Sequence, residues 1–500
     1  MKKVKTDVLI AGYGFAGAIA AIVAHDAGAT VLVSEKMAQF GGCSMLSGGG
    51  VTYVQDPEGG FEYFKEMCGG RTPDSVIRAQ AQMMAKTVDF IDQLCKVNGA
   101  KYAIRSRPGT YPYPGRDSLN SLTVREVPGF DGYPWLVPGP GMHGYKLMKV
   151  LEDNITKRKI QTMMSTATKE LVLNKKGEVV GALLEGGSGE IEVKARKAVI
   201  LACGGFEHNE WLKLQYVEGK PYYSMAPLGN TGDGILMAQQ VGATLWHMWH
   251  MHGSYGFKYP EFKIAFRHHL SGAREPYGYR PFYFKMRWIV VDQAGRRFMN
   301  EYPPAPQDTS HRPLGYFNPD IPGYPRIPCY LIFDEPARLG GPISEPLGLR
   351  EHAYEWSKDN SKEVEKGWII AANTLDDLAV RIKVDASSLK ATVRRWNQFV
   401  REGRDTDFGR PKETMSGPVE TAPFYAMEAW PTITNTQGGP EHDEHQKVLN
   451  YKGKPVPRLY AAGELGSMFG HLYELGGNIG EAITSGRIAG WNAAKEETLP

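Results

Sequence analysis

Short apolar runs alternate with glycine-rich turns and helical segments near the amino terminus. Residues 7–11, DVLIA, form an apolar run behind one acid, which favours a buried strand of a parallel sheet. The alanine-rich segment AIAAIVAHDAG predicts a helix that ends at Gly28, and TVLVSEK predicts a second strand that closes at Glu35. Strand, turn, helix and strand in this order predict a βαβ unit of an α/β fold.

Similar patterns return in the middle and at the end of the chain. Residues 73–97 and 143–155 have helical periodicity, and residues 169–185 predict a hairpin around Lys176-Gly177. Further segments predict two buried strands that run into glycines, at 197–206 and 458–464, and two helices that follow glycine turns, at 228–243 and 476–494.

The pattern changes between residues 266 and 435, where the rhythm of strand, glycine turn and helix is absent. We therefore predict one α/β domain in two parts, residues 1–265 and 436–500, interrupted by an inserted domain at 266–435. A cleft between the two domains would bind a substrate. Residues 105–145 are rich in Pro, Gly and Tyr and predict an ordered but irregular excursion.

Composition narrows the class of protein. Hydrophobic residues make up 42% and charged residues 23% of the 500 residues, as in globular proteins with a real core. The net charge of +3, without a dense Lys/Arg run, argues against a nucleic-acid partner. The five cysteines are scattered and odd in number, which favours reduced thiols in the cytoplasm.

The amino terminus has basic residues before an apolar run, as a signal peptide does. Asp7 at the start of the run, the glycines inside it and the missing cleavage site argue against secretion. Elsewhere no uncharged apolar stretch reaches the ~20 residues that a membrane-spanning helix needs. We therefore expect a cytoplasmic protein without a membrane span.

The turn after the first strand carries the glycine pattern of dinucleotide-binding folds. Gly12 permits a tight turn, Gly14 lets the backbone approach a pyrophosphate, and Gly17 lets the helix meet the strand. The positive end of the helix attracts the phosphates. Glu35, about 20 residues further on, is placed to accept hydrogen bonds from a ribose diol.

A second glycine-rich loop, GGCSMLSGGG at residues 41–50, distinguishes between the possible dinucleotides. It offers successive backbone N–H groups with few side chains, which suits a flat ring or a phosphate. Nicotinamide enzymes have no need of such a loop here, whereas flavoproteins often have one, so we predict FAD. Cys43 has no second cysteine nearby and is interpreted as packing against the cofactor.

The helix predicted at 476–494 also begins at glycines. Its positive end would face the flavin pyrimidine and stabilise the anionic reduced flavin. The candidate cofactor-binding residues are Gly12, Gly14, Phe15, Ala16, Gly17, Glu35, Lys36, Gly41, Gly42, Cys43, Ser44, Ser47, Gly48, Gly49, Gly50, Ala202, Gly204, Asp233, Gly463, Glu464, Asn478 and Ile479.

Two histidine-rich segments, HMWHMHG at 247–253 and EHDEH at 441–445, have spacings that can serve zinc. The first is interleaved with Trp and Met, no HExxH motif occurs, and flavin chemistry needs no metal, so we predict no metal site. The segments are instead interpreted as an aromatic wall of the substrate cleft. Together with the aromatic segments 253–260 and 275–288, this wall favours a bulky, ring-containing substrate.

Five motifs occur in an order known from one family of flavoenzymes: DVLIAGYGFAGAIAA, GGCSMLSGGG, ILACGGF, GRRFMNE and RLYAAGELGSMFGHLYELGGNIGEAITSGRIAG. Over nearly its whole length the chain resembles the FAD-dependent fumarate reductase / 3-ketosteroid dehydrogenase superfamily. The resemblance implies a glutathione-reductase-like (Rossmann-type) FAD-binding domain with an inserted α+β capping domain. It also implies hydride exchange between flavin N5 and a carbon–carbon bond next to a carbonyl or carboxylate, with a protein acid or base serving the second carbon.

The chain departs from the fumarate reductase branch at three positions. The proton-donating arginine of that branch corresponds to Ala305, the histidine ahead of T-x-G-G to Asn435, and the arginine of N-R-L-G-G-N to Glu474. A dicarboxylate needs cations, best a bidentate arginine, and an acid would repel it. We therefore expect neither fumarate nor succinate as substrate. Glu474 is interpreted either as this repelling acid or as a solvated side chain.

The ketosteroid dehydrogenase branch has a tyrosine just before its last glycines, which Tyr473 and Gly477 match. A phenol can donate a hydrogen bond to a ketone oxygen as enolate charge develops, which is typically worth about 10²–10⁴ in rate. The tyrosine base of that branch falls on Ala305, so the candidate proton carriers are Tyr302 and Tyr133. Tyr473 is the expected carbonyl clamp.

The resemblance thus implies an FAD-dependent oxidoreductase acting on CH–CH groups, of the ketosteroid dehydrogenase or ene-reductase type. Three alternatives remain: a fumarate-reductase-like reductase of an unsaturated aryl carboxylate, an FAD-dependent hydroxylase or oxidase, and an FAD-binding protein with a degenerate site.

No second G-x-G-x-x-G unit for a nicotinamide is evident, so we expect a separate electron carrier, which is a protein, a quinone or free flavin. The first glycine loop lacks the histidine used by membrane-complex relatives, so non-covalent FAD is expected. Arg296 and Arg297 are interpreted as structural residues that brace the domain junction.

Overall fold

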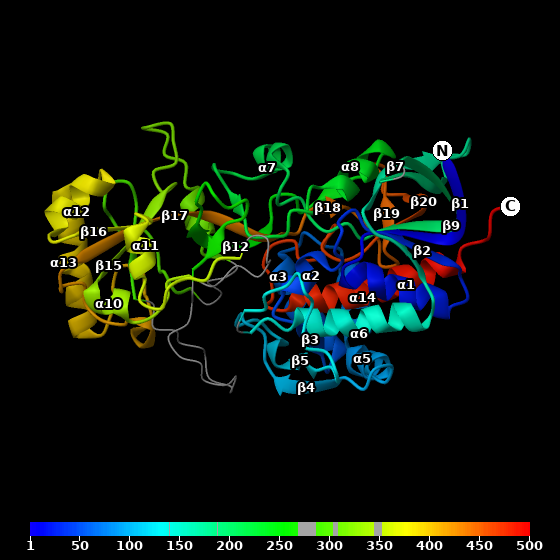
Figure 1. Cartoon of the computed structure of the whole chain (residues 1–500), viewed down its shortest axis with the longest axis horizontal. Helices are drawn as coiled ribbons and strands as arrows, with labels where there is room; N and C mark the ends of the chain where they lie inside the picture. The colour runs from blue at the N-terminus through cyan, green and yellow to red at the C-terminus, as the bar shows by residue number, and fades with distance from the viewer. Residues whose placement is uncertain (140, 188, 269–286, 304–308, 345–352) are drawn as a thin grey trace. The chain divides into compact units, whose positions relative to one another are not determined.

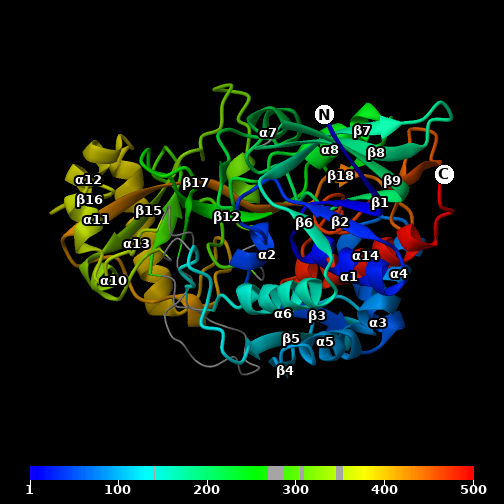
Figure 2. The same ribbon diagram turned by 45° about the vertical axis from the view of Figure 1, so that its right-hand side comes forward.

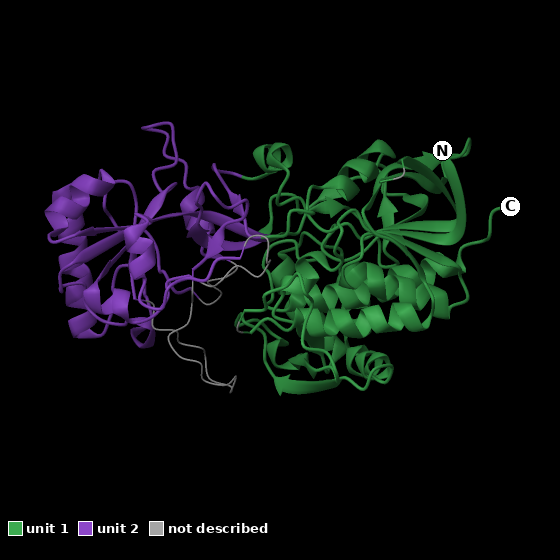
Figure 3. Ribbon diagram, in the orientation of Figure 1, with its two compact units in different colours: residues 1–217, 226–251, 435–500 green, residues 218–225, 252–434 purple. Residues whose placement is uncertain are grey.

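The computed structural model describes residues 1–139, 141–187, 189–268, 287–303, 309–344 and 353–500. Within these residues the chain forms two compact units (Figure 3). Unit 1 comprises residues 1–217, 226–251 and 435–500, and unit 2 comprises residues 218–225 and 252–434. The domains predicted at 1–265, 266–435 and 436–500 divide the chain at nearby positions and stay a prediction.

Unit 1 is built on a sheet whose central strands are parallel (Figure 1). Its main path runs β19 (Lys447–Leu449), β20 (Pro455–Ala461), β9 (Gly189–Leu201), β1 (Lys2–Ala11), β2 (Val31–Ser34) and β6 (Gln161–Met163). The predicted hairpin is confirmed as β7 (Thr166–Leu173) and β8 (Val179–Gly186), which pairs with β9. The predicted strands at 7–11, 197–206 and 458–464 are confirmed within β1, β9 and β20.

Helices α1 (Phe15–Asp26), α6 (Gly144–Lys157) and α14 (Gly477–Lys495) lie side by side on one face of this sheet (Figures 1 and 2). Helix α14 approaches α1 closely because two of its glycines face the α1 backbone. A Cβ at Gly486 would lie 2.6 Å from Ala16 O, and one at Gly490 would lie 2.5 Å from Ala20 O. All three helices have nearly their predicted bounds.

Further elements of unit 1 are short. Residues 73–97 form two helices, α4 and α5, rather than one. The bounds are α2 (Gly42–Leu46), α3 (Pro57–Cys68), α4 (Asp74–Met84), α5 (Thr87–Cys95), η1 (Arg116–Ser118), α7 (Glu210–Tyr216), α8 (Asp233–Gln240), β11 (Leu245–Trp246) and β18 (Gly439–Pro440).

The prediction of an irregular excursion over residues 105–145 is wrong in its middle. Strand β5 (Leu119–Glu126) pairs antiparallel with β3 (Gly50–Val54) and β4 (Lys101–Ser106), and its first six residues are buried. Proline- and glycine-rich stretches flank β5 and conceal its pattern. Strand β3 also fixes the start of α14, because Thr52 donates from its N–H to Gly476 O (3.2 Å) and from Oγ1 to Leu475 O (2.9 Å).

Unit 2 is an α+β structure around a second sheet. Its path is β13 (Phe266–Arg267), β12 (Met251–Phe257), β17 (Phe424–Thr436), β15 (Cys329–Asp334) and β14 (Ile289–Val291), while β10 (Tyr223–Ser224) and β16 (Ile369–Ala372) also pair with β17. Its helices include α10 (Glu335–Leu339), α11 (Ser361–Glu365), α12 (Leu375–Ile382) and α13 (Ala386–Glu402), with the short turns η2 (Arg312–Gly315) and η4 (Lys412–Thr414). The apolar faces of α12 and α13 pack on the sheet in one core.

Across the described residues of both units, no helix combines the length and apolarity that crossing a bilayer requires.

A buried ionic network occupies the interior of unit 2. Arg297 donates to Glu301 at 2.9 and 2.8 Å and to Asp405 at 2.9 Å, and Arg410 lies 3.4 Å from Glu301. Burial alone would raise the pKa of Glu301, but Arg297 and then Arg410 hold this pKa below its usual value. All these partners of Arg297 belong to unit 2.

Replacing Glu301 by Ala is expected to lower the stability of unit 2 by about 3–5 kcal/mol, because a buried guanidinium loses a carboxylate partner. Urea unfolding followed by tryptophan fluorescence measures this loss. The matched control is Asp407→Ala, which removes the more exposed pair between Arg395 and Asp407 and should cost at most about 1 kcal/mol. Equal losses in the two variants would contradict the assigned role of the network.

Candidate functional site

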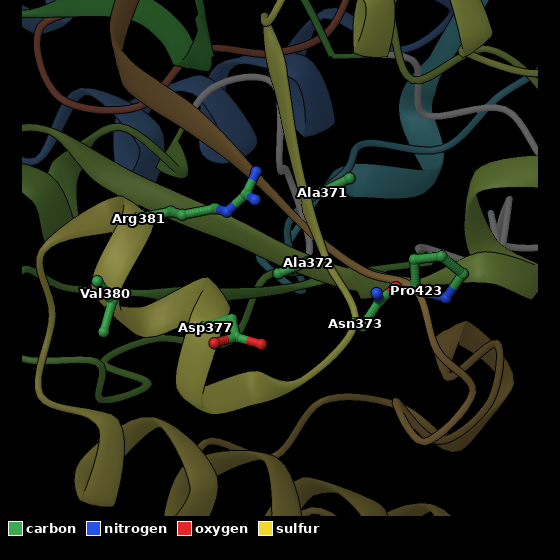
Figure 4. A pocket seen from close by; sticks show the side chains of 7 residues that line it. All are labelled: Ala371, Ala372, Asn373, Asp377, Val380, Arg381 and Pro423. Carbon is green, nitrogen blue, oxygen red and sulfur yellow. The ribbon is translucent and has the colours of Figure 1, made fainter.

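Figure 4 shows a pocket of about 320 Å³ in unit 2, lined by Ala371, Ala372, Asn373, Asp377, Val380, Arg381 and Pro423. No aromatic ring is among these lining residues, so a flat ring system has no stacking partner there. None of the residues predicted from the sequence lines this pocket. The candidate site is therefore built from the glycine turns of unit 1.

The first glycine turn is closed against the end of β9. Gly12 has φ +106°, and a Cβ there would lie 2.2 Å from Ala202 O. A Cβ at Gly17 would lie 2.0 Å from Gly12 O, so α1 can begin directly behind β1 only with glycine at this position. The N-cap of α1 is Gly14, which offers no capping side chain, so the first turn of the helix presents backbone N–H groups.

Glu35 follows β2 at the same edge of the sheet. Its Oε2 accepts the Tyr13 N–H at 3.0 Å, and its Oε1 accepts the Met37 N–H at 2.9 Å. Burial raises the pKa of Glu35 above its usual value. Each carboxylate oxygen has two lone pairs, so the predicted hydrogen bonds from a ribose diol remain possible for this side chain.

The second glycine loop is more ordered than the sequence predicts, because its first part forms the short helix α2. Phe15 N–H donates to Ser44 Oγ at 3.0 Å, which joins this helix to the first glycine turn. A Cβ at Gly49 would lie 2.6 Å from the Gly144 nitrogen, so the loop also packs on the start of α6. Cys43 Sγ accepts from Asn230 Nδ2 at 3.3 Å, and burial holds the pKa of its thiol well above the usual value.

Lys36 and Asp233, two predicted cofactor-binding residues, form an ion pair with each other at 2.7 Å. Thr231 Oγ1 also donates to Asp233 at 2.8 Å. Other predicted residues stand at strand ends: Gly204 (φ +71°) follows β9, and Gly463 (φ +81°) follows β20 and donates its N–H to Ser485 Oγ at 2.9 Å.

Two carboxyl groups meet where β9 and β20 end. Oε1 of Glu207 accepts the Thr436 N–H at 2.7 Å, and Oε1 of Glu464 accepts the same N–H at 3.1 Å. Burial raises the pKa of Glu464 well above its usual value, and Glu207 raises it further. Two adjacent buried carboxylates cannot both ionise easily, so the neighbouring Glu207 favours the protonated form of Glu464. Sequence reasoning missed Glu207, because one acid after ILACGGF carries no distinguishing signal.

The tyrosine loop, residues 466–476, leads into α14. Tyr473 is buried, and its hydroxyl oxygen accepts the Gly476 N–H at 3.1 Å. Gly476 is the N-cap of α14, so the phenol oxygen lies at the positive end of this helix. Gly477 donates its N–H to Glu474 O at 2.7 Å, and its role in holding a substrate carbonyl stays a prediction.

Glu474 does not have the environment expected from the sequence. It is 2% exposed, so the interpretation as a solvated side chain is wrong. Its carboxylate accepts from Tyr63 Oη at 2.5 Å, from Thr110 N–H at 2.9 Å and from Thr110 Oγ1 at 2.8 Å. These donors, which sequence reasoning missed, compensate the charge inside the protein.

The two candidate proton carriers lie in different units. Tyr133 is in unit 1, where its hydroxyl donates to Glu152 Oε2 at 2.9 Å and its ring contacts Phe40 and Trp135. Tyr302 is in unit 2, and its N–H donates to Asn300 Oδ1 at 2.8 Å. Ala305 and most of the aromatic segment 275–288 lie outside the described residues.

These features of unit 1 fit a flavin adenine dinucleotide. The closed glycine turn and the α1 amino terminus suit a pyrophosphate, and Glu35 suits a ribose. Near α14, the amides of Gln437 and Asn478 are buried, and neither has a hydrogen-bond partner among the described residues. Unsatisfied buried amides are costly, and the pyrimidine edge of a flavin offers the matching donors and acceptors.

A family described as FAD binding domain matches residues 7–479, so the chain belongs to this family. The 3-oxosteroid 1-dehydrogenase of Mycobacterium tuberculosis is 26% identical over 578 residues that cover 98% of each chain. The fumarate reductase (cytochrome) of Shewanella frigidimarina is 29% identical, with 98% of this chain and 77% of that protein covered.

Among solved structures, the 3-ketosteroid delta1-dehydrogenase from Sterolibacterium denitrificans in complex with 1,4-androstadiene-3,17-dione has a TM-score of 0.81. The match covers 98% of this chain and 99% of that chain at 22% identity, and it shows a common fold. The predicted superfamily, the Rossmann-type FAD-binding fold with an inserted cap, and FAD as cofactor are thereby confirmed. The chain is an FAD-dependent oxidoreductase acting on CH–CH groups.

Gly17→Ala is expected to weaken FAD binding by more than about tenfold, because the added Cβ would force the turn open at Gly12. Flavin absorbance of the purified protein and titration with FAD measure this effect. Gly187→Ala is the matched control, since a Cβ there meets nothing within 4 Å. Unchanged FAD affinity in Gly17→Ala would show that the turn does not hold the cofactor.

Glu207→Gln is expected to stabilise the FAD-loaded protein more at pH 8 than at pH 5. The pKa of Glu464 is higher in the folded than in the unfolded chain, so folding takes up a proton and stability falls as pH rises. An amide at position 207 removes the carboxylate repulsion and donates to Glu464. The melting temperatures of wild type and variant at both pH values test this, with the exposed Glu190→Gln as control. A pH-independent difference would argue against this coupling of Glu207 with Glu464.

Proposed function

We propose that the chain exchanges a hydride between FAD and a C–C or C=C bond next to the carbonyl of a neutral, bulky, ring-containing substrate, as ketosteroid dehydrogenases and ene-reductases do. When bound, FAD supplies the hydride acceptor or donor at N5 of its ring system. The observation that carries this proposal is the position of the Tyr473 hydroxyl at the amino terminus of α14.

Tyr473 serves as the carbonyl clamp in this proposal. The Gly476 N–H that donates to its oxygen polarises the phenol and makes its O–H a stronger donor. The positive end of α14 favours the negative charge that collects on the substrate oxygen as the neighbouring carbon gains or loses a proton. A neutral ketone needs such a donor and no counter-ion.

A proton must also be exchanged at the second carbon. Tyr133 is poorly suited to this task, because burial and then Glu152 raise the pKa of its hydroxyl far above the usual value. Its O–H is moreover committed to Glu152 Oε2. We therefore assign the proton transfer to Tyr302.

The second candidate is a reductase of an unsaturated aryl carboxylate, and one observation favours it. Arg71 stands next to the tyrosine loop, since a Cβ at Gly470 would lie 2.8 Å from Arg71 Cβ. Its guanidinium carbon lies 5.2 Å from the centroid of the Trp249 ring. A cation beside an aromatic face is a plausible receptor for an aryl carboxylate.

The electrons come from or go to a separate carrier, which is a protein, a quinone or free flavin, and the FAD is held without a covalent bond. The five cysteines are free, which supports a cytoplasmic location.

Tyr473→Phe is expected to lower the rate of hydride transfer by about 10²–10⁴, with unchanged FAD content, because the donor to the substrate oxygen is lost. Anaerobic mixing of the FAD-loaded enzyme with 3-keto steroids, cyclic enones, aryl acrylates and fumarate measures this rate from the flavin absorbance. Tyr451→Phe, which changes an exposed tyrosine, is the control.

A near wild-type rate in Tyr473→Phe would remove Tyr473 from the reaction. Turnover of aryl acrylates alone, lost in Arg71→Gln, would favour the second candidate. Formation of an oxygen-dependent product would instead indicate a hydroxylase or oxidase, and no reaction with any member of the panel a degenerate site.

A further inference from the structure

The tyrosine loop begins with four residues whose backbone carbonyls all accept hydrogen bonds from side chains. Three of these donors are histidines. The bonds are His442 Nε2 to Gly466 O at 2.9 Å, His247 Nδ1 to Ser467 O at 2.7 Å, Thr72 Oγ1 to Met468 O at 2.7 Å and His250 Nδ1 to Phe469 O at 2.6 Å.

The three histidines belong to the two segments whose spacing resembles a zinc site. The described residues contain no group of three His, Cys, Asp or Glu side chains that could hold a metal ion. The pairing of β11 with β18 brings the two segments together, because β11 ends just before His247 and β18 just before His442. The Trp246 ring contacts both segments, with centroid distances of 4.5 Å to His247 and 4.9 Å to His442.

The opposite side of the loop is held by α14. Glu481 accepts the Met468 N–H and the Ser467 Oγ–H, each at 2.5 Å. Residues 466–470, the first part of the loop, begin and end with a glycine, and both glycines let neighbouring groups approach closely. A Cβ at Gly466 would lie 2.3 Å from Pro440 O, and one at Gly470 would lie 2.8 Å from Nε2 of His247. Side chains from several elements therefore fix this backbone.

The histidine rings suit this task because each is rigid and buried. Burial lowers the pKa of His247 and of His442, so both rings are neutral at pH 7 and carry a single N–H. In His247 the contact of Nδ1 with Ser467 O (2.7 Å) is shorter than that of Nε2 with Arg71 O (3.1 Å), so the loop carbonyl is the better acceptor. In His442 the contacts of Nε2 with Gly466 O (2.9 Å) and of Nδ1 with Asp443 O (3.0 Å) are nearly equal, and the proposal assigns its one N–H to Gly466 O.

We propose that His247, His250 and His442 are positioning residues that hold the tyrosine loop in the conformation in which Tyr473 meets the substrate carbonyl. This inference rests on the proposed function of Tyr473. His250 has the most direct effect, because its acceptor Phe469 contacts Tyr473 in an edge-to-face arrangement at 6.0 Å between ring centroids. The histidines themselves touch neither substrate nor cofactor in this proposal.

His250→Phe is expected to lower kcat by about 10²-fold with little change in KM, because a small displacement of a reacting group has this effect on rate. His250→Asn should restore most of the rate, since the Asn amide nitrogen takes the place of Nδ1. His208→Phe is the matched control, because His208 Nε2 also contacts a backbone carbonyl of unit 1, Ala226 O at 2.8 Å, outside the loop.

Hydrogen exchange of the FAD-loaded protein, followed by mass spectrometry, gives a readout independent of turnover. Faster exchange confined to residues 466–476 in His250→Phe, and reversed in His250→Asn, supports the proposal. An unchanged rate and unchanged exchange in His250→Phe, or a failure of Asn to restore them, overturns it. Should His250→Phe not fold, the pair His442→Leu and His442→Gln makes the same comparison at Gly466, with the Gln amide nitrogen in the place of Nε2.

Combination with Tyr473→Phe separates this inference from the proposed function. When the histidine acts through the phenol, His250→Phe lowers the rate no further in a Tyr473→Phe background. If the rate losses of the two single variants multiply in the double variant, the positioning role is overturned while the proposed function of Tyr473 stands. A wild-type rate in Tyr473→Phe refutes the proposed function, and the exchange of residues 466–476 then decides alone whether the histidines hold the loop.

Discussion

The irregular backbone before α14 has to be buried without leaving its polar groups unpaired, and much of the site depends on this constraint. Residues 466–469 belong to no helix or strand, yet Met468 and Phe469 are fully buried. Buried carbonyls without partners are rare because they lose their hydrogen bonds to water. The donors therefore come from side chains, which explains why histidine and threonine are buried around this loop. In the proposed arrangement these bonds also set the position of Tyr473, since the next regular element begins only at α14.

The residues of the cofactor site are brought together in a different way, by the parallel sheet. Gly12, Glu35, Gly204 and Gly463 follow β1, β2, β9 and β20, so they share the carboxyl edge of one sheet. Parallel strands bring such residues together whatever their separation in the chain, and open α/β sheets bind dinucleotides at this edge. Regular elements thus build the cofactor site, whereas an irregular loop held by side chains presents the proposed carbonyl clamp. A cofactor site built from regular elements can be shared by a whole family, whereas a loop held by side chains can differ between the branches of that family.

This difference decides what the sequence could predict. Strands β1, β2, β9 and β20 and helices α1, α6 and α14 follow from local periodicity and glycine turns, and so does the FAD fingerprint. Strand β5 was missed because its proline- and glycine-rich neighbours conceal it. The partners of Glu474 could not be predicted, because Tyr63 and Thr110 are 411 and 364 residues away along the chain. The spacing of His247, His250 and His442 suggested zinc, and only the pairing of β11 with β18 shows their contacts with one loop.

The environment of Glu474 also changes the physical reason for expecting a neutral substrate. From the sequence, this acid was expected either to repel a dicarboxylate or to be solvated. In the structure its carboxyl group is buried and accepts hydrogen bonds from Tyr63 and Thr110, so it is engaged with neighbouring residues of unit 1. We therefore attribute the expected discrimination against a diacid to the missing arginine at this position. A bidentate arginine would neutralise a carboxylate, whereas the Tyr473 phenol can only donate one hydrogen bond. In the proposed function, this donor serves a ketone oxygen, whereas a second carboxylate would find no counter-ion at this position, which is costly for a buried charge.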